Sequence, residues 1–166
     1  MIETNVKTER AIFASGCFWG TEFYFQTAKG VLETNVGYTG GHKENATYRE
    51  VCTGNTGHAE ATEVLFDPSQ TSYEELAKLF FETHNPGHKN RQGPDIGTQY
   101  RSAIFYLNDE QKATAENLVQ QLKEKGHEVV TEITKADIFW KAEDKHQQYY
   151  TKDGGNPYCH RYIKKF

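Results

Sequence analysis

The 166-residue sequence lacks long apolar runs and holds only one methionine, three cysteines and four prolines. Its longest apolar stretches, such as residues 11–14 and 103–107, fall far short of the roughly 20 residues that span a bilayer. We therefore expect no transmembrane helix and no membrane partner. The N-terminal residues show no apolar core followed by a cleavage site, which predicts the absence of a signal peptide and a cytoplasmic location.

An excess of positive charge is also missing. Nineteen Lys and Arg residues stand against 23 Asp and Glu residues, so the formal net charge is −4. Because a phosphate backbone requires a basic surface, this balance disfavours nucleic acid as a partner. The length and the 36% hydrophobic residues are enough for one packed core. We expect one catalytic domain over residues 1–166, with a flexible C-terminal tail from about residue 151.

The three cysteines are odd in number, widely spaced and free of any CxxC motif. A disulfide framework and a cysteine-based zinc site are therefore both disfavoured. His84 and His88 are four residues apart, but Pro86 and Gly87 between them prevent a shared helical face. The sequence predicts no metal site, and any reactive role must rest on individual thiols.

Strand and helix patterns alternate along the chain in the order βαββαβ, followed by a further helix, a strand and a tail. The predicted strands cover residues 9–14, 31–38, 59–66, 102–107 and 129–134. Predicted helices cover residues 17–26, 71–81, 109–125 and 142–150, and a long loop runs from 83 to 100. This pattern favours an α+β fold, a two-layer α/β sandwich with a ferredoxin-like βαββαβ core, a mixed sheet and a C-terminal tail.

Cys17 lies between two glycines where the first strand turns into a helix, in Gly16-Cys17-Phe18-Trp19-Gly20. A helix N-terminus offers unpaired N–H groups and positive dipole potential, which favour a thiolate. Cys17 is therefore a candidate nucleophile, although a small buried residue beneath two aromatic rings explains the position equally well. Phe18 and Trp19 cannot both face the core, so one of them borders the outside.

Glu60 begins a strand and shares its face with the alternate residues Thr62, Val64 and Phe66. A carboxyl group held among apolar groups has a raised pKa and can act as an acid near neutral pH. An exposed glutamate at a strand end is the alternative. Tyr48 and Tyr100 are candidate hydrogen-bond donors to a polar substrate oxygen.

Cys159 lies seven residues before the C-terminus and follows Gly154-Gly155 and Pro157. A tail cysteine that reaches a sulfenic acid can convert it into a disulfide, which a reductant reopens. Cys52, within a predicted short helical turn at 48–53, is the alternative for this role, and a packing residue is the simpler interpretation of it.

Together these segments resemble the class A peptide methionine sulfoxide reductases, whose characteristic motif is GCFWG. The further matches, in the same order as in that family, are residues 47–52 (TYREVC), 57–60 (GHAE), 95–102 (DIGTQYRS) and 146–149 (HQQY). The resemblance covers nearly the whole chain. It implies reduction of the S epimer of methionine sulfoxide, free or in proteins, to methionine, in the repair of oxidative damage.

The same resemblance implies a role for each matched residue. Cys17 would attack the sulfoxide sulfur and Glu60 would protonate the oxygen, with Tyr48 and Tyr100 as its hydrogen-bonding neighbours. The matched substrate-binding residues are Phe18 and Trp19, which would hold the methyl group, and Asp95, which would support the site.

Cys159 would then form a disulfide with Cys17, and thioredoxin would reduce it. No metal, flavin or nicotinamide cofactor is implied, because the thiols carry the electrons. Many relatives have a Gly-Tyr-Cys turn or two C-terminal cysteines, whereas this chain has Pro157-Tyr158-Cys159 and no second one.

Two other classes remain open from the residues alone. One is a different thiol enzyme, such as a cysteine hydrolase or peroxidase, that uses Cys17 with a histidine as base. The other is a redox-responsive binding module in which Cys17 and Cys159 form a reversible disulfide without substrate turnover. Neither accounts for Glu60, Tyr48 and Tyr100 as a set.

Overall fold

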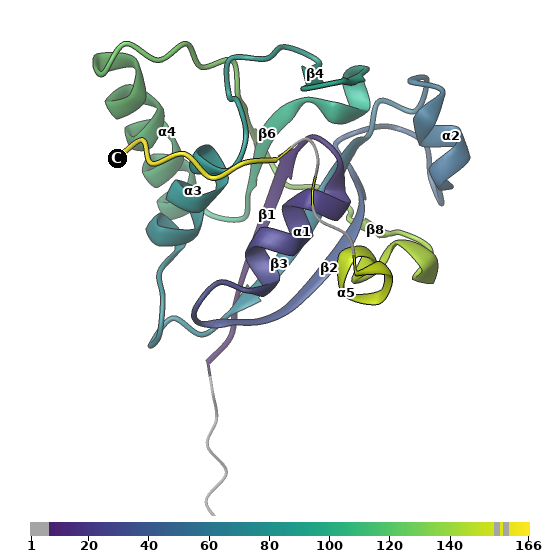
Figure 1. Ribbon diagram of the computed structural model, residues 1–166, viewed down its shortest axis with the longest axis horizontal. Helices are drawn as coiled ribbons and strands as arrows, with labels where there is room; N and C mark the ends of the chain where they lie inside the picture. The colour runs from purple at the N-terminus through teal and green to yellow at the C-terminus, as the bar shows by residue number, and fades with distance from the viewer. Residues whose placement is uncertain (1–6, 155–156, 158–159) are drawn as a thin grey trace, which may run out of the picture.

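The computed structural model describes residues 7–154, 157 and 160–166. Within them the chain forms a six-stranded sheet in the order β7-β6-β1-β3-β2-β8 (Figure 1). The strands are β1 (Glu9–Ser15), β2 (Val31–Thr39), β3 (Ala59–Phe66), β6 (Ser102–Tyr106), β7 (Glu132–Lys135) and β8 (Trp140–Lys141). β6 and β7 are parallel and the other neighbouring pairs are antiparallel, so the sheet is mixed.

The four central strands follow the βαββαβ order predicted from the sequence. β6, β1, β3 and β2 lie side by side, and helices connect β1 to β2 and β3 to β6. This arrangement confirms the α+β class and the ferredoxin-like core. β7 and β8 extend the sheet at its two edges, which the βαββαβ pattern alone does not specify.

The principal helices are α1 (Phe18–Gln26), α3 (Tyr73–Glu82) and α4 (Asp109–Glu124), and they cover one face of the sheet. Figure 1 shows α1 and α3 in front of the strands. Side chains of β1 alternate between the faces, as a strand requires. Phe13 packs with Phe25 of α1 and Phe80 of α3, whereas Ile12 and Ala14 point to the opposite face.

Polar residues define where the helices begin. The side chain of Ser72 accepts a hydrogen bond from the backbone N–H of Glu75 at the start of α3, and Asn108 does the same for Gln111 at the start of α4. The short helix α2 (Tyr48–Cys52) begins at a reciprocal capping box between Thr47 and Glu50. Such caps satisfy backbone donors that have no partner inside the helix.

The predicted helix over residues 142–150 is wrong. The structure has a short 3-10 helix, η2 (Asp144–His146), then α5 (Tyr149–Asp153), separated by Gln148 with a left-handed φ of 57°. The Gln147 side chain accepts a hydrogen bond from Val36 N–H and donates one to Val36 C=O, which binds this segment to β2. A tertiary contact therefore interrupts the helix, and local periodicity does not reveal it.

The predicted long loop over residues 83–100 contains regular structure. β4 (Arg91–Gln92) and β5 (Asp95–Ile96) form a small hairpin, and the 3-10 helix η1 (Thr98–Tyr100) follows it. The Gln92 amide accepts from Asn85 N–H and donates to Asn85 C=O, so the start of the loop is tied to the hairpin. This loop is ordered around the site described below.

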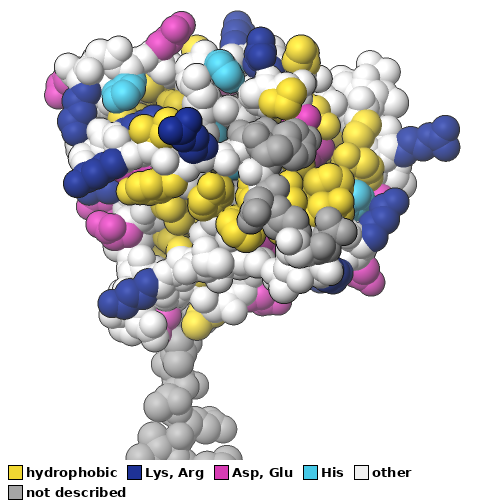
Figure 2. Space-filling model, in the orientation of Figure 1, with side chains coloured by type: hydrophobic (Ala, Val, Ile, Leu, Met, Phe, Trp, Pro, Cys, Tyr) yellow, Lys and Arg dark blue, Asp and Glu magenta, His cyan; other side chains and the backbone are white. Residues whose placement is uncertain are grey.

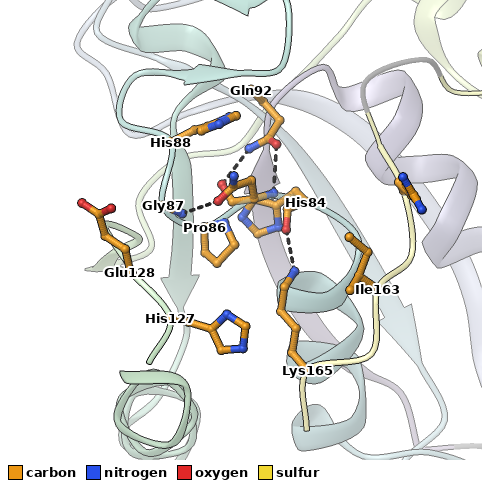
Figure 3. A pocket seen from close by; sticks show the side chains of 11 residues that line it. His84, Pro86, Gly87, His88, Gln92, His127, Glu128, Ile163 and Lys165 are labelled. Carbon is orange, nitrogen blue, oxygen red and sulfur yellow. Dashed lines mark hydrogen bonds between the residues drawn. The ribbon is translucent and has the colours of Figure 1, made fainter. Parts of the chain in front are cut away.

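The described C-terminal residues cross the end of α3 (Figure 1). The backbone N–H groups of Arg161 and Ile163 donate to the carbonyls of Thr83 and Glu82, over 3.3 and 2.7 Å. Lys165 donates from its amine to the His84 carbonyl over 2.9 Å, beside an open cavity of about 540 Å³ (Figure 3). Residues 160–166 thus contact the core, and the flexibility of the tail as a whole stays a prediction.

Candidate active site

Cys17 occupies the tight connection between β1 and α1. Gly16 precedes it with a φ of 99°, a value that a residue with a side chain rarely adopts, and a Cβ there would collide with the Gln92 side chain. Cys17 is the N-cap of α1, and its carbonyl accepts hydrogen bonds from Gly20 and Thr21. Cys17 thus lies at a helix N-terminus, as the sequence predicts, and its side chain is buried.

Glu60 is the carboxyl group of the site, and it is only 1% exposed at the start of β3. Its Oε1 accepts a hydrogen bond from the backbone N–H of Phe18 over 3.2 Å. Oε2 is buried and has no hydrogen-bond partner among the described residues. The alternative of an exposed glutamate at a strand end is therefore wrong.

Burial raises the pKa of Glu60 well above the usual range of a glutamate, and the nearby side chains of Cys17 and Asp95 raise it further. The hydrogen bond from Phe18 opposes this shift but does not reverse it. A carboxyl group in this environment retains its proton to higher pH than one in water. Glu60 is therefore suited to give a proton to a bound group.

Tyr48 and Tyr100 approach the same carboxyl group from two other elements. Tyr48 begins α2 and Tyr100 ends η1, and both side chains are half-buried. Burial raises the pKa of each phenol, and the Glu60 carboxyl is the next largest cause in both. Both hydroxyls therefore stay protonated and can donate hydrogen bonds to an oxygen held beside Glu60.

Phe18 and Trp19 form an aromatic wall beside Cys17. Phe18 is fully buried, whereas Trp19 is half-buried, so one of the two borders the outside as expected. Trp19 stacks on Tyr149 with ring centroids 3.8 Å apart, and Phe18 lies near Tyr48. Figure 2 shows hydrophobic side chains gathered on this face over the region of α1 and α5.

His146 belongs to this wall, although its place in the sequence predicted no role for it. Its Nδ1 accepts a hydrogen bond from Trp19 Nε1–H over 3.1 Å, and its ring lies 4.3 Å from that of Tyr48. Burial lowers the pKa of His146, which keeps the ring neutral, and an accepting Nδ1 places the proton on Nε2. The match of residues 146–149 (HQQY) to the family was the available signal, but it assigned no role to His146.

Glu143 connects the aromatic wall to α2. One of its oxygens accepts from the Tyr38 hydroxyl over 2.8 Å and the other from the backbone N–H of Tyr48 over 3.1 Å. The position of Tyr48 therefore depends on a segment nearly a hundred residues later in the chain.

His58 lies two residues before Glu60 in the sequence and is buried. Its ring forms hydrogen bonds with the backbone of Gly41 and Lys43 in the preceding loop, so its role is structural.

The other two cysteines differ in what the structure says of them. Cys52 is exposed at the end of α2, and the nearby Tyr48 hydroxyl acts to lower the pKa of its thiol. Burial of part of its surface raises the pKa of the Cys52 thiol, with Glu60 and Cys17 among the nearby groups that add to the shift. Cys159 lies outside the described residues, but the next residue, His160, is buried against Ser15.

In the described part of the chain, no group of three or more His, Cys, Asp or Glu side chains is placed to hold a metal ion. His84 uses its two ring nitrogens on the Phe80 carbonyl and the Ser102 hydroxyl. In the same residues no helix is both long and apolar enough to cross a membrane.

The fold thus brings together a cysteine at a helix N-terminus, a buried carboxyl group, two phenols and an aromatic wall. Asp95, from the β4–β5 hairpin, is close enough to raise the pKa values of Glu60 and Tyr100. A sulfur nucleophile beside three proton or hydrogen-bond donors suits a reaction in which an oxygen must leave. These features define the class as an α+β protein with a candidate active site built around a thiol.

Comparison with known proteins gives the family. Residues 9–166 match the family model of peptide methionine sulfoxide reductase. A relative named peptide methionine sulfoxide reductase MsrA, from Methanosarcina acetivorans, is 54% identical over 149 residues, which cover 88% of this chain and 79% of the relative. One of the same name from Saccharolobus solfataricus is 47% identical and covers 95% of this chain and 92% of the relative.

Solved structures agree with this result. Mxr1 from Saccharomyces cerevisiae in reduced form has a TM-score of 0.89 at 31% identity, with 98% of this chain and 94% of that chain covered. Methionine sulfoxide reductase A of Corynebacterium diphtheriae has a TM-score of 0.82 at 37% identity, covering 95% of this chain and 81% of that one. Mxr1 in complex with Trx2 matches at 22% identity with a TM-score of 0.65, covering 98% and 94%.

The chain therefore belongs to the peptide methionine sulfoxide reductase family. It is an oxidoreductase whose reaction is the reduction of methionine sulfoxide.

Proposed function

We propose that the enzyme reduces the S epimer of methionine sulfoxide, free or in proteins, with Cys17 as nucleophile and Glu60 as acid. The observation that carries the proposal is the Glu60 carboxyl group. It is buried beside Cys17, is held at Oε1 by the Phe18 N–H, and has an Oε2 without a partner among the described residues. A substrate oxygen can occupy the place next to Oε2.

The first step transfers the sulfoxide oxygen to the enzyme. The Cys17 sulfur attacks the sulfoxide sulfur, while Glu60 protonates the oxygen and Tyr48 and Tyr100 donate hydrogen bonds to it. Protonation matters because an unprotonated sulfoxide oxygen is a poor leaving group. The oxygen ends on Cys17 as a sulfenic acid and methionine leaves, so the Cys17 sulfur loses the two electrons that the substrate sulfur gains.

The aromatic wall supports recognition of the substrate side chain. Phe18 and Trp19 present apolar rings for the methyl group on the sulfoxide sulfur, and His146 and Tyr149 hold the indole of Trp19 in place. Asp95 supports the site through its influence on Glu60. The handedness of this arrangement, with the methyl group on one side and the oxygen on the other, is the basis for selecting one epimer.

The second step returns the enzyme to its reduced form. The Cys159 thiol attacks the sulfur of the Cys17 sulfenic acid, a Cys17–Cys159 disulfide forms and water leaves. Thioredoxin then gives two electrons and two protons to the disulfide. The solved complex of Mxr1 with Trx2 supports a partner of this kind. The proposal places the enzyme in the cytoplasm, where thiols are kept reduced, and treats residues 1–166 as one catalytic domain.

The reaction is tested with the separated S and R epimers of an N-acetylated methionine sulfoxide and dithiothreitol as reductant. We expect turnover of the S epimer only, and none with Cys17→Ser. Equal turnover of both epimers would contradict the proposed selectivity. A fully active Cys17→Ser would contradict the assignment of the nucleophile.

The recycling step is tested with Cys159→Ser and Cys52→Ser under thioredoxin-driven conditions. We expect Cys159→Ser to complete one turnover and stop, and Cys52→Ser to continue. Full thioredoxin-driven activity of Cys159→Ser together with its loss in Cys52→Ser would assign the second step to Cys52. An acyl-enzyme or rapid peroxide turnover would instead favour the alternative thiol chemistries.

A further inference from the structure

We propose that His160 is a positioning residue for the recycling step. It anchors the chain beside the start of α1, one peptide bond after Cys159, and loss of this anchor should slow the reaction of the Cys159 thiol with Cys17. The inference rests on the proposed function, since it concerns how the second thiol is delivered. His160 itself takes no part in the bond changes.

The imidazole of His160 is buried among residues that flank Cys17. Its Nε2 lies 2.7 Å from the carbonyl oxygen of Ser15, the last residue of β1. The hydroxyls of Ser15 and Thr21, each 3.4 Å away, lie on the two elements that Cys17 joins. Tyr24 of α1 adds a hydrogen bond from its hydroxyl to the His160 carbonyl. The contacts thus join the tail to both sides of the nucleophile.

Gly20 shows that the site for the imidazole is built into α1. A Cβ at Gly20 would collide with three ring atoms of His160, including Nδ1. Gly20 has no unusual φ, so conformational freedom does not explain this glycine. The second glycine of GCFWG instead leaves the space that the tail histidine fills.

The protonation state of His160 suits an anchor. Burial lowers its pKa to about 4, so the ring is neutral at pH 7. A neutral imidazole has one N–H, and a carbonyl oxygen 2.7 Å from Nε2 requires that proton to be on Nε2. His160 therefore donates to Ser15 in a buried position where the hydrogen bond is costly to lose.

The physical consequence is a high effective concentration of the second thiol. Cys159 is joined directly to the anchored His160, and the Cα atoms of adjacent residues are about 3.8 Å apart. Ser15, to which His160 is bound, is two residues from Cys17. Restricting two reacting groups in this way speeds their reaction because less entropy is lost when they meet.

A second, separate anchor of the tail provides a matched control. Lys165 donates from its amine to the carbonyl of His84 (Figure 3). The amine also donates to the carbonyl of Phe81, and the backbone N–H of Lys165 donates to Glu82. Lys165→Met removes the amine contacts but leaves His160 in place. If the proposal holds, the proximal anchor alone governs the reaction of the two thiols.

The experiment mixes excess reduced enzyme with the S epimer, quenches with acid, and measures methionine formed and thiols lost over time. We compare His160→Met, which fills space without donating, with His160→Gln, whose amide can still donate to Ser15. His160→Met should form methionine at a rate within about twofold of the unchanged enzyme but form the disulfide at least about tenfold more slowly. His160→Gln should retain part of the rate, and Lys165→Met should match the unchanged enzyme.

Steady-state assays give an independent readout. Thioredoxin-driven kcat should fall in His160→Met, whereas dithiothreitol-driven turnover, in which the small thiol reduces the sulfenic acid directly, should persist. A purely structural role for His160 would lower both. Normal disulfide formation in folded His160→Met, or equal slowing by Lys165→Met, would overturn the proposal.

Cys159→Ser separates this inference from the proposed function. If Cys159→Ser still recycles with thioredoxin, the assignment of the second thiol fails and the role of His160 fails with it. If Cys159→Ser is blocked while the His160 variants form the disulfide normally, only the role of His160 is wrong.

Discussion

The backbone N–H of Phe18 donates a hydrogen bond to Glu60 Oε1 over 3.2 Å, which joins the residue after Cys17 to the start of β3. The proposed nucleophile, Cys17, and the proposed acid, Glu60, come from elements more than forty residues apart, and this bond links those elements. Oε2 has no hydrogen-bond partner among the described residues, and the proposed function places the substrate oxygen there. Substitutions at Glu60 and around it therefore report on both the chemistry and the fold.

Glu60→Gln keeps the shape of the side chain but removes the transferable proton. We expect methionine formation to slow by about 10²- to 10⁴-fold, the usual contribution of general acid catalysis. Single-turnover methionine release measures this rate. Glu63→Gln is the control, because Glu63 lies on the same strand but pairs with Arg10 and Asn35 away from the site. A loss of similar size in Glu63→Gln would contradict a specific role for Glu60.

The same substitution should stabilise the fold at high pH. Because burial raises the pKa of Glu60, the folded state holds its proton when the unfolded state has released it. The free energy of unfolding therefore falls as pH rises above the unfolded value near 4.5. Urea unfolding should show Glu60→Gln more stable than the unchanged protein at pH 8, with no gain below pH 4.5. An equal gain at both pH values would exclude ionisation as its cause.

Gly20→Ala should displace the His160 side chain, because the new Cβ and the imidazole cannot occupy the same space. We expect a loss of about 1–3 kcal/mol in the free energy of unfolding, typical of overpacking. Combining Gly20→Ala with His160→Ala should remove most of that cost. Additive losses in the double-mutant cycle would show that the two residues do not share this space.

His146→Leu removes the acceptor for the Trp19 indole while the stack on Tyr149 remains. We expect KM for N-acetylated methionine sulfoxide to rise several-fold, by an amount consistent with loss of about 1 kcal/mol from one hydrogen bond. The dithiothreitol-driven kcat should change less than KM. An unchanged KM would indicate that the Trp19 position does not depend on His146.

Acid should weaken the fold through two buried histidines. Burial lowers the pKa of His84 to about 3 and that of His160 to about 4, both below the usual 6.5. Such groups add stability above pH 6.5 that is lost as pH falls toward their folded values. Urea unfolding at about pH 7.5 and about pH 4.5 should show a smaller pH dependence in His160→Gln than in the unchanged protein. An equal pH dependence of the unfolding free energy in the two proteins would show that His160 does not cause the loss of stability in acid.

Much of the fold could be read from local patterns. The strand, turn and helix around Cys17 and the β3 strand at Ala59–Phe66 depend on alternation, glycine placement and helix periodicity, which are properties of neighbouring residues. The place of Glu60 on the same strand face as Val64 and Phe66 could be read in this way, but its burial could not, because an exposed position at the strand end fitted the pattern too. Residues 142–150 do not form the helix that their local pattern predicts, because the Gln147 side chain binds the backbone of Val36.

The candidate site was likewise only partly predictable from the sequence. Its motifs indicated Cys17, Glu60, Tyr48 and Tyr100, but they did not indicate that His146 would hold Trp19. That contact joins residues 127 positions apart and exists only after α1 and the η2 segment have packed together.

The amino-acid sequence alone specified the element order, the cysteine at the start of α1, the face on which Glu60 lies and the family to which the chain belongs. Tertiary packing was needed to leave Glu60 with one oxygen bound and one free of any described partner, and to bring His160 into the space above Gly20. Short-range periodicity determines secondary structure, whereas burial and pairing depend on which distant elements meet. The packing of these distant elements raises the pKa of Glu60, because the largest cause of the shift is the removal of water from around the carboxyl group.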